Sequence, residues 1–257
     1  ALETLSGRAV MSNLHGMFSL GAMAGAALTG ALLRAGIAPA LQLAAIGAAV
    51  AALVALAARG MLASHPAAAE DEPQAHFAWP RGLLLVIGLM IFAGMSAEGV
   101  MYDWSVLYLK QEVGLTQDVA AMGYAAFTGA MAAARFGGDA LRARLPERSL
   151  LRGSAALAAV AMAVVLLSGH PVVAMLGYAL VGAGLAPVVP ILYNAATRVP
   201  GTSRAAAIAA VSSIGYAGFM IGPPLIGSIA QAVSLTAAMS VVAVMAGLLA
   251  VGARRVG

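Results

Sequence analysis

The sequence predicts an all-α, polytopic transmembrane helix bundle with eight spans, and three observations support this prediction. Of the 257 residues, 62% are hydrophobic and only 9% are charged, whereas a soluble domain carries about 25% charged residues. Apolar runs of roughly 17 to 25 residues recur along the chain, which indicates spanning helices rather than the short alternating strands of a barrel. The 30 glycines allow helices to pack closely in lipid.

Composition also excludes several classes of function. The chain has no cysteine, so a disulfide, a thiolate metal site or a cysteine nucleophile is impossible. Its four histidines are scattered, and neither a metal-ligand spacing nor a phosphate-binding glycine loop is found. The net charge of +4 does not indicate nucleic-acid binding, because the basic residues follow a membrane topology. We therefore predict no cofactor and no metal.

Eight apolar segments satisfy the length of about 20 residues that a spanning helix needs. Turn signals containing glycine and proline separate several of them, at residues 35–39, 169–171 and 199–201. The expected spans, in chain order, are Leu14–Leu33, Ala40–Ala58, Leu83–Leu109, Val119–Phe136, Leu151–Ser168, Val172–Ala195, Ala205–Val233 and Leu235–Ala253.

The polar connection after the second span predicts a domain boundary. Residues 61–80 are rich in alanine, proline and acidic side chains, a composition typical of a flexible linker. We therefore expect residues 1–60 to belong to one bundle and residues 81–257 to another. Because the chain opens on a polar stretch, Glu3–Asn13, without an initiator methionine or a signal peptide pattern, we expect it to begin partway through a longer protein.

The third span contains the strongest functional signal, two carboxylates five residues apart. A charged group inside a membrane costs about 2.5 kcal/mol or more, so such a group is by default a functional candidate. At about 100° per residue, Glu98 shares a helix face with Tyr102 and Ser105, whereas Asp103 falls about 140° away. Local unwinding at Gly99 would bring the two carboxylates together. We expect Glu98 to face a central cavity, as a proton-coupling group or a hydroxyl-binding acceptor.

Other polar groups in the apolar spans are candidates for lining the same cavity. A histidine near the start of the first span is one of them, because its charge changes near neutral pH. Each candidate has a structural alternative, since polar side chains also bridge membrane helices and an acidic residue can mark the membrane interface. The candidates besides Glu98 are Tyr102, Asp103, His15, Tyr124, Asn194 and Tyr216.

Two proline-containing stretches predict bent helices. Pro187 and Pro190 lie in the sixth span, and Pro223–Pro224 lies among glycines in the seventh. Proline removes a backbone donor and kinks a helix, which a membrane tolerates only where neighbours or water satisfy the freed carbonyls. Each stretch is expected to be either a gating element or a place of close glycine packing.

The basic residues predict the orientation of the spans, because cytoplasmic loops carry an excess of Lys and Arg. When the eight spans alternate in direction, only Arg34 and Lys110 fall on one side, so the N-terminal stretch, the linker and the C-terminus are expected in the cytoplasm. The arginines on the cytoplasmic side are Arg8, Arg59, Arg81, Arg135, Arg142, Arg144, Arg148, Arg152, Arg198, Arg204, Arg254 and Arg255.

These features resemble the major facilitator superfamily of secondary transporters, whose members have twelve helices in two six-helix halves joined by a long cytoplasmic linker. The stretches Arg8–Gly21 and Glu98–Ser105 look like those of a bacterial inner-membrane branch near the fucose-permease-like proteins. The resemblance implies that the eight spans match helices five to twelve, with the first four absent. Residues 1–60 would then be the last two helices of the N-terminal half, and residues 81–257 the C-terminal half.

The basic stretch after the fourth span, Arg135–Arg144, is similar to the cytoplasmic Gly/Asp/Arg signature of this superfamily. Asp139 and Arg142 match it best, whereas Arg135 stands where the signature has glycine. The resemblance implies a conformational latch, in which Asp139 faces the positive end of a helix and Arg135 and Arg142 pair with carboxylates in one state only. Positive-inside anchoring also explains the arginines.

The resemblance and Glu98 together favour a secondary active transporter, not an enzyme. Two bundles would rock around a midplane site, moving a small solute with protons or another coupling ion across the inner membrane; uptake and efflux both stay open. Two alternatives also stay open at this point. One is a membrane-embedded enzyme with Glu98 and Asp103 as an acid–base pair, although no nucleophile or cofactor motif accompanies them. The other is a truncated fragment that does not transport.

Overall fold

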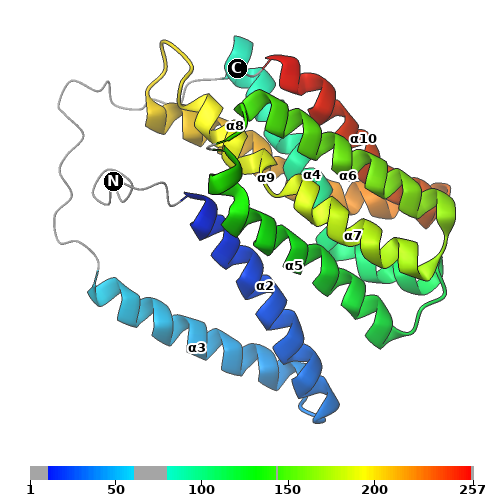
Figure 1. Cartoon of the computed structure of the whole chain (residues 1–257). Helices are drawn as coiled ribbons and strands as arrows, with labels where there is room; N and C mark the ends of the chain where they lie inside the picture. The colour runs from blue at the N-terminus through cyan, green and yellow to red at the C-terminus, as the bar shows by residue number, and fades with distance from the viewer. Residues whose placement is uncertain (1–10, 61–79, 143, 256–257) are drawn as a thin grey trace.

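The computed structural model describes residues 11–60, 80–142 and 144–255, and every regular element in those ranges is helical. The all-α prediction is therefore confirmed for the described part of the chain. Figure 1 shows a bundle of helices with a further pair along one side. The elements are α2 (Met11–Arg34), α3 (Pro39–Arg59), α4 (Gly82–Gln111), α5 (Gln117–Arg142), α6 (Glu147–Ser168), α7 (Pro171–Leu185), α8 (Val188–Ala196), α9 (Arg204–Ala232), α10 (Leu235–Gly252) and the short 3₁₀ turn η1 (Ala253–Arg255).

Each expected span overlaps a helix, and the sixth is divided between α7 and α8. By length and composition, six stretches of the described residues are apolar enough to cross a membrane: α3, α4, α6, α7 with α8, α9, and α10 with η1. The helix α5 falls outside this set, and it contains four charged side chains, Asp118, Arg135, Asp139 and Arg142. Since α2 also falls outside, the count of eight spans stays a prediction.

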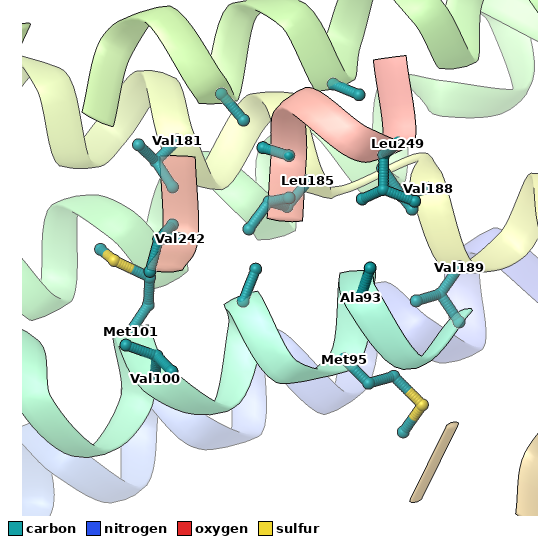
Figure 2. Packing of buried hydrophobic residues seen from close by; sticks show 14 of the residues in the cluster. Ala93, Met95, Val100, Met101, Val181, Leu185, Val188, Val189, Val242 and Leu249 are labelled. Atoms are coloured by element: carbon teal, nitrogen blue, oxygen red, sulfur yellow. The ribbon is translucent and has the colours of Figure 1, made fainter. Parts of the chain in front are cut away.

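The helix α4 forms the centre of the bundle. It packs against α9 and α10 and also contacts α5 and α8, and most residues of its apolar stretch are buried. Around it, α5 packs on α7, and α6 packs on both α7 and α10. Figure 2 shows Val100 and Met101 of α4 facing Val181 of α7 and Val242 of α10 in this core. A helix that is apolar all round is expected to be buried in this way.

The packing between these helices depends on glycine at the closest approaches. A Cβ atom added to Gly182 of α7 would lie 2.1 Å from the carbonyl oxygen of Phe127 in α5. A Cβ atom added to Gly218 of α9 would lie 2.7 Å from the carbonyl oxygen of Phe92 in α4. Small residues let helices approach closely in membranes, so these two positions fix how near α5 and α9 come to their neighbours.

The pair α2 and α3 is packed very differently from the rest. The helix α2 lies along α5, whereas α3 projects away from the bundle (Figure 1). Gln42 is the one buried residue of α3, and apolar side chains such as Leu43 and Leu53 are exposed. The division into residues 1–60, 61–80 and 81–257 stays a prediction, because residues 61–79 lie outside the described part.

The two proline stretches have different structures. Pro187 separates α7 from α8, so the sixth span is broken as a bent helix requires. By contrast, α9 continues through Pro223 and Pro224 as one helix. Two of its glycines, Gly218 and Gly222, pack directly against the backbone of α4. Close packing therefore describes the second stretch, and a break describes the first.

Candidate functional site

An ion pair between α4 and α5 lies inside the bundle. Nη2 of Arg135 donates to both carboxylate oxygens of Glu98, at 3.1 Å from Oε1 and 3.3 Å from Oε2. The side chains are 2% exposed for Arg135 and 6% for Glu98. Burying a charge is costly unless the charge is paired and hydrogen-bonded. The two charges therefore compensate each other inside the bundle.

The sequence around each partner explains how the two charges meet. Arg135 follows three alanines in α5, and Glu98 lies between Ala97 and Gly99 in α4. Both charged residues therefore have small neighbours in their own helices, and their long side chains meet between α4 and α5. Arg135 was expected in a basic loop, and this expectation is wrong because α5 continues to Arg142. The carboxylate of Glu98 compensates its charge, so the helix does not need to end before it.

A further hydrogen bond connects Arg135 to the break in the sixth span. Its Nε donates to the carbonyl oxygen of Ala186 at 3.5 Å. In a regular helix the amide of residue 190 would donate to this carbonyl, four residues earlier, but Pro190 has no amide hydrogen. Arg135 therefore supplies a donor to a carbonyl that the proline leaves without one. One guanidinium thus joins α4, α5 and the junction of α7 with α8.

Aromatic side chains lie next to the ion pair. Tyr102, one turn beyond Glu98 on α4, interacts electrostatically with both Glu98 and Arg135. Its hydroxyl donates to Sδ of Met131 at 3.7 Å. Its ring lies 6.1 Å from that of Tyr124 and 5.6 Å from that of Phe127, measured between centroids. The structure therefore brings together Glu98, Tyr102 and Tyr124, which were predicted to line a cavity, with Arg135, which was predicted to be part of a latch.

Two other predicted residues, Asp103 and Tyr216, are not part of this group. Asp103 lies on the exposed side of α4, close enough to Tyr124 for an electrostatic interaction. Unwinding at Gly99 does not occur, because α4 is continuous and the glycine leaves space for the ring of Phe219. Tyr216 is 60% exposed on α9. The side chain of His15 lies outside the described part of the structure.

Asn194 belongs to a second charged cluster, which we call the Glu147 cluster. Glu147 begins α6, and its Oε1 accepts from Nη2 of Arg142 at 2.7 Å and from Nδ2 of Asn194 at 2.9 Å. Its Oε2 accepts from Nη2 of Arg198. Asn194 therefore joins the end of α8 to the start of α6 instead of lining a cavity beside Glu98. Arg142 pairs with a carboxylate, as a latch requires, whereas the side chain of Asp139 lies outside the described part.

Sequence reasoning did not find the partner of Glu98, although a signal was present. Tyr124, Thr128, Met131 and Arg135 recur at helical spacing, so they share one face of α5. Thr128, Met131 and Arg135 are buried, which identifies this face as the one packed inside the bundle. Reading Arg135 as the first residue of a loop concealed the pattern, because a loop arginine needs no buried partner.

Comparison of this chain with known proteins identifies a matching family. Residues 7–206 and 86–256 match the family model described as Major Facilitator Superfamily. An uncharacterized MFS-type transporter of Yersinia pestis is 38% identical over 259 residues, which cover 99% of this chain and 66% of the relative. The membrane protein MosC of Rhizobium meliloti is 37% identical over 156 residues, 61% of this chain and 38% of MosC.

Solved structures show the same fold. The crystal structure of the fucose:proton symporter FucP of E. coli matches with a TM-score of 0.71 and 19% identity, over 83% of this chain and 55% of FucP. FucP in an outward conformation matches with a TM-score of 0.67 and 20% identity. This chain therefore spans about two thirds of the length of its Yersinia relative and about half of FucP.

Proposed function

Because this chain belongs to the major facilitator superfamily, we propose that it serves a secondary active transporter that couples movement of a small solute to protons. The protein is a multi-pass membrane protein by family and by its apolar helices, and we place it in the bacterial inner membrane. The observation that carries the proposal is the buried pair of Glu98 and Arg135. Intramembrane charges of this kind are characteristic of ion and substrate pathways.

The chemistry of the pair makes it suited to proton coupling. A proton on Glu98 removes the negative charge, but Arg135 keeps its positive charge because a guanidinium does not lose its proton in proteins. Removing one partner of a buried pair costs about 3–5 kcal/mol. Protonation of Glu98 therefore weakens the ion pair between α4 and α5 and favours any arrangement of helices that does not depend on it. A ligand that binds one state better shifts the equilibrium between two states, and here the proton is that ligand.

The structural neighbours support the same choice. FucP is described as a fucose:proton symporter, and the Yersinia relative is named as a transporter. An enzyme using Glu98 and Asp103 as an acid–base pair is not favoured, because the described structure pairs Glu98 with Arg135 and leaves Asp103 on the exposed side of α4. The protein is thus placed among transporters, not enzymes.

We extend the proposal to topology. Residues 1–60 and 81–257 are assigned to the N-terminal and C-terminal halves, residues 61–80 to the linker between them, and the eight helical segments to eight spans. The arginine bias supports a cytoplasmic C-terminus. Arg135 lies in α5 and not in a loop. The other eleven of the twelve arginines listed above still support the proposed cytoplasmic side.

The test is proton movement in proteoliposomes that contain the purified full chain and a trapped pH-sensitive dye. A panel of solutes beginning with L-fucose is added, and solute-driven acidification of the lumen is measured. Glu98→Gln is expected to abolish the solute-dependent proton signal. Glu112→Gln is the matched control, because Glu112 lies near the same helix but bonds only with Thr236 among the described residues, and it should behave as the unmodified protein. Unchanged pH dependence in Glu98→Gln would refute the coupling role.

A further inference from the structure

Two neighbouring helices, α6 and α10, carry arginines at one end. Arg148 and Arg152 lie on adjacent turns near the start of α6, and Arg254 and Arg255 belong to the turn η1 that follows α10. The helix α6 packs on α10 (Figure 1) and also contacts η1. Ala253, the first residue of η1, is fully buried, so this turn is held on the bundle beside α6.

Contacts of two glycines show that the start of α6 and the end of α10 lie at the same end of the bundle. A Cβ atom added to Gly184 of α7 would lie 2.6 Å from the carbonyl oxygen of Ser154 in α6. A Cβ atom added to Gly94 of α4 would lie 3.1 Å from Val188 and 3.9 Å from Leu249 of α10. Because Val188 follows Gly184 by four positions, the two pairs of arginines lie close to one level.

These four arginines form a basic surface. All of them are exposed, and the described structure gives none of them an ion-pair partner. Glu147, which precedes Arg148, is held by Arg142 and Arg198. This end of α6 and α10 is therefore open to a negatively charged group.

Beyond the arginines, both helices present exposed apolar side chains. The helix α10 contains no charged residue, and α6 contains none after Arg152. The 18 residues of α10 extend about 27 Å, close to the thickness of the hydrocarbon core of a bilayer. We call the four arginines and these exposed apolar side chains the α6–α10 face; the apolar members are Val160, Val164 and Leu167 of α6 and Val244, Leu248 and Val251 of α10.

We propose that the α6–α10 face binds an anionic phospholipid, with the phosphate on the arginines and the acyl chains along the apolar side chains. Guanidinium groups donate paired hydrogen bonds to phosphate oxygens, and basic pockets between membrane helices bind anionic headgroups. Positive-inside orientation explains why arginines gather on one side of a membrane, but it requires no particular headgroup and no particular pair of helices. The lipid site is independent of whether Glu98 couples protons.

The test measures lipid retained by the purified full chain in native mass spectrometry, with two lipids offered in equal amounts. Dioleoyl phosphatidylglycerol and dioleoyl phosphatidylcholine have the same acyl chains and differ in headgroup charge. Each basic residue near an anionic lipid contributes roughly fivefold in affinity, so phosphatidylglycerol should be retained at least about fivefold more. Glycerol 3-phosphate, which has the phosphate without the chains, should not displace it at the same concentration.

A pair of double variants tests the basic end of the face. Arg148→Gln/Arg152→Gln should lose most of the preference for phosphatidylglycerol. Arg59→Gln/Arg204→Gln is the matched control, because it removes the same charge from exposed positions on α3 and α9, and it should keep the preference. Both variants should unfold at the same temperature as the unmodified chain in lipid-free detergent, since the changed side chains are exposed.

A third variant, Val160→Ser/Val164→Ser, tests the apolar part of the face. It should weaken retention of both lipids and leave their ratio unchanged. Equal retention of the two lipids by the unmodified chain, or an equal loss of preference in the control, would overturn the inference. Displacement by glycerol 3-phosphate would show a site for a soluble phosphate instead. A lower unfolding temperature of Arg148→Gln/Arg152→Gln would mean that these arginines hold the bundle and not a lipid, which would also overturn it.

Discussion

Among the residues that the structure describes, two glutamate–arginine clusters differ mainly in their access to solvent. Glu98 is buried and has one arginine partner, which is itself buried. Glu147 lies at the start of α6, is 26% exposed, and accepts hydrogen bonds from Arg142, Asn194 and Arg198. The same two residue types therefore form an isolated pair in one place and a partly hydrated network in the other.

The comparison indicates that the number of partners does not determine how much a charge cluster contributes to the free energy of unfolding. A partly exposed ion pair contributes about 0–1 kcal/mol, because water already solvates both charges and salt screens them. A buried pair is different, since breaking it leaves a charge that water cannot reach. We therefore expect the pair with one arginine to respond more strongly to mutation than the cluster with two.

The largest effect is expected for Arg135→Gln. This change leaves Glu98 charged and buried without its partner, so the free energy of unfolding should fall by about 3–5 kcal/mol. Unfolding of the purified protein in mixed micelles by a denaturing detergent measures the change. Adding Glu98→Gln should recover most of the loss, because the double variant has no buried charge. Arg148→Gln, an exposed position on α6, is the control, and an equal loss there would contradict the comparison.

A smaller effect is expected for Glu147→Gln. The glutamine keeps one acceptor for Asn194 but loses the charge that holds Arg142 and Arg198, so the cost should be about 1 kcal/mol. The same unfolding assay measures it. A cost as large as that of Arg135→Gln would mean that partial exposure does not weaken the Glu147 cluster.

Salt should sharpen the contrast between the two clusters. The screening length falls from about 10 Å at 0.1 M ionic strength to about 3 Å at 1 M, and buried pairs are screened much less than exposed ones. The cost of Glu147→Gln should therefore fall by at least about half in high salt, while the cost of Arg135→Gln stays the same. Parallel unfolding curves at the two ionic strengths test this; equal salt sensitivity would show that water reaches the Glu98 pair.

The smallest effect is expected for Asp103→Asn. Asp103 lies on the exposed side of α4, so its removal should change the free energy of unfolding by no more than about 0.5 kcal/mol. A transport assay on the same variant asks a separate question, whether this carboxylate contributes to solute flux. A large loss of stability would indicate that the helix packs against Asp103 in a way that the described residues do not show.

Much of the fold was predictable, because the apolar runs in a chain with few charges leave membrane helices as the one way to satisfy the backbone. The separation of Glu98 from Asp103 followed from the helical period and is confirmed, since one is buried and the other exposed. The break at Pro187 was also predicted, by a proline that removes a backbone donor.

What the sequence did not reveal are contacts between helices. Arg135 looked like a loop residue because hydropathy treats every arginine as hydrated, and nothing in its local sequence identifies a carboxylate 37 positions earlier. Asn194 looked like a cavity residue because it is polar within an apolar span, although it binds Glu147. The continuity of α9 through Pro223 and Pro224 depends equally on neighbours, since its glycines pack on α4.

The short helix α8 links the two clusters. Ala186, two positions before its first residue, accepts from Arg135, and Asn194, in its last turn, donates to Glu147. The two anchors are eight positions apart, which at a rise of about 1.5 Å per residue places them roughly 12 Å from each other along the helix. A rigid helix that is anchored at both ends transmits a displacement of one end to the other. Release of Arg135 from Ala186 would therefore displace α8 and weaken the bond from Asn194 to Glu147, so that a change at the buried pair reaches the Glu147 cluster.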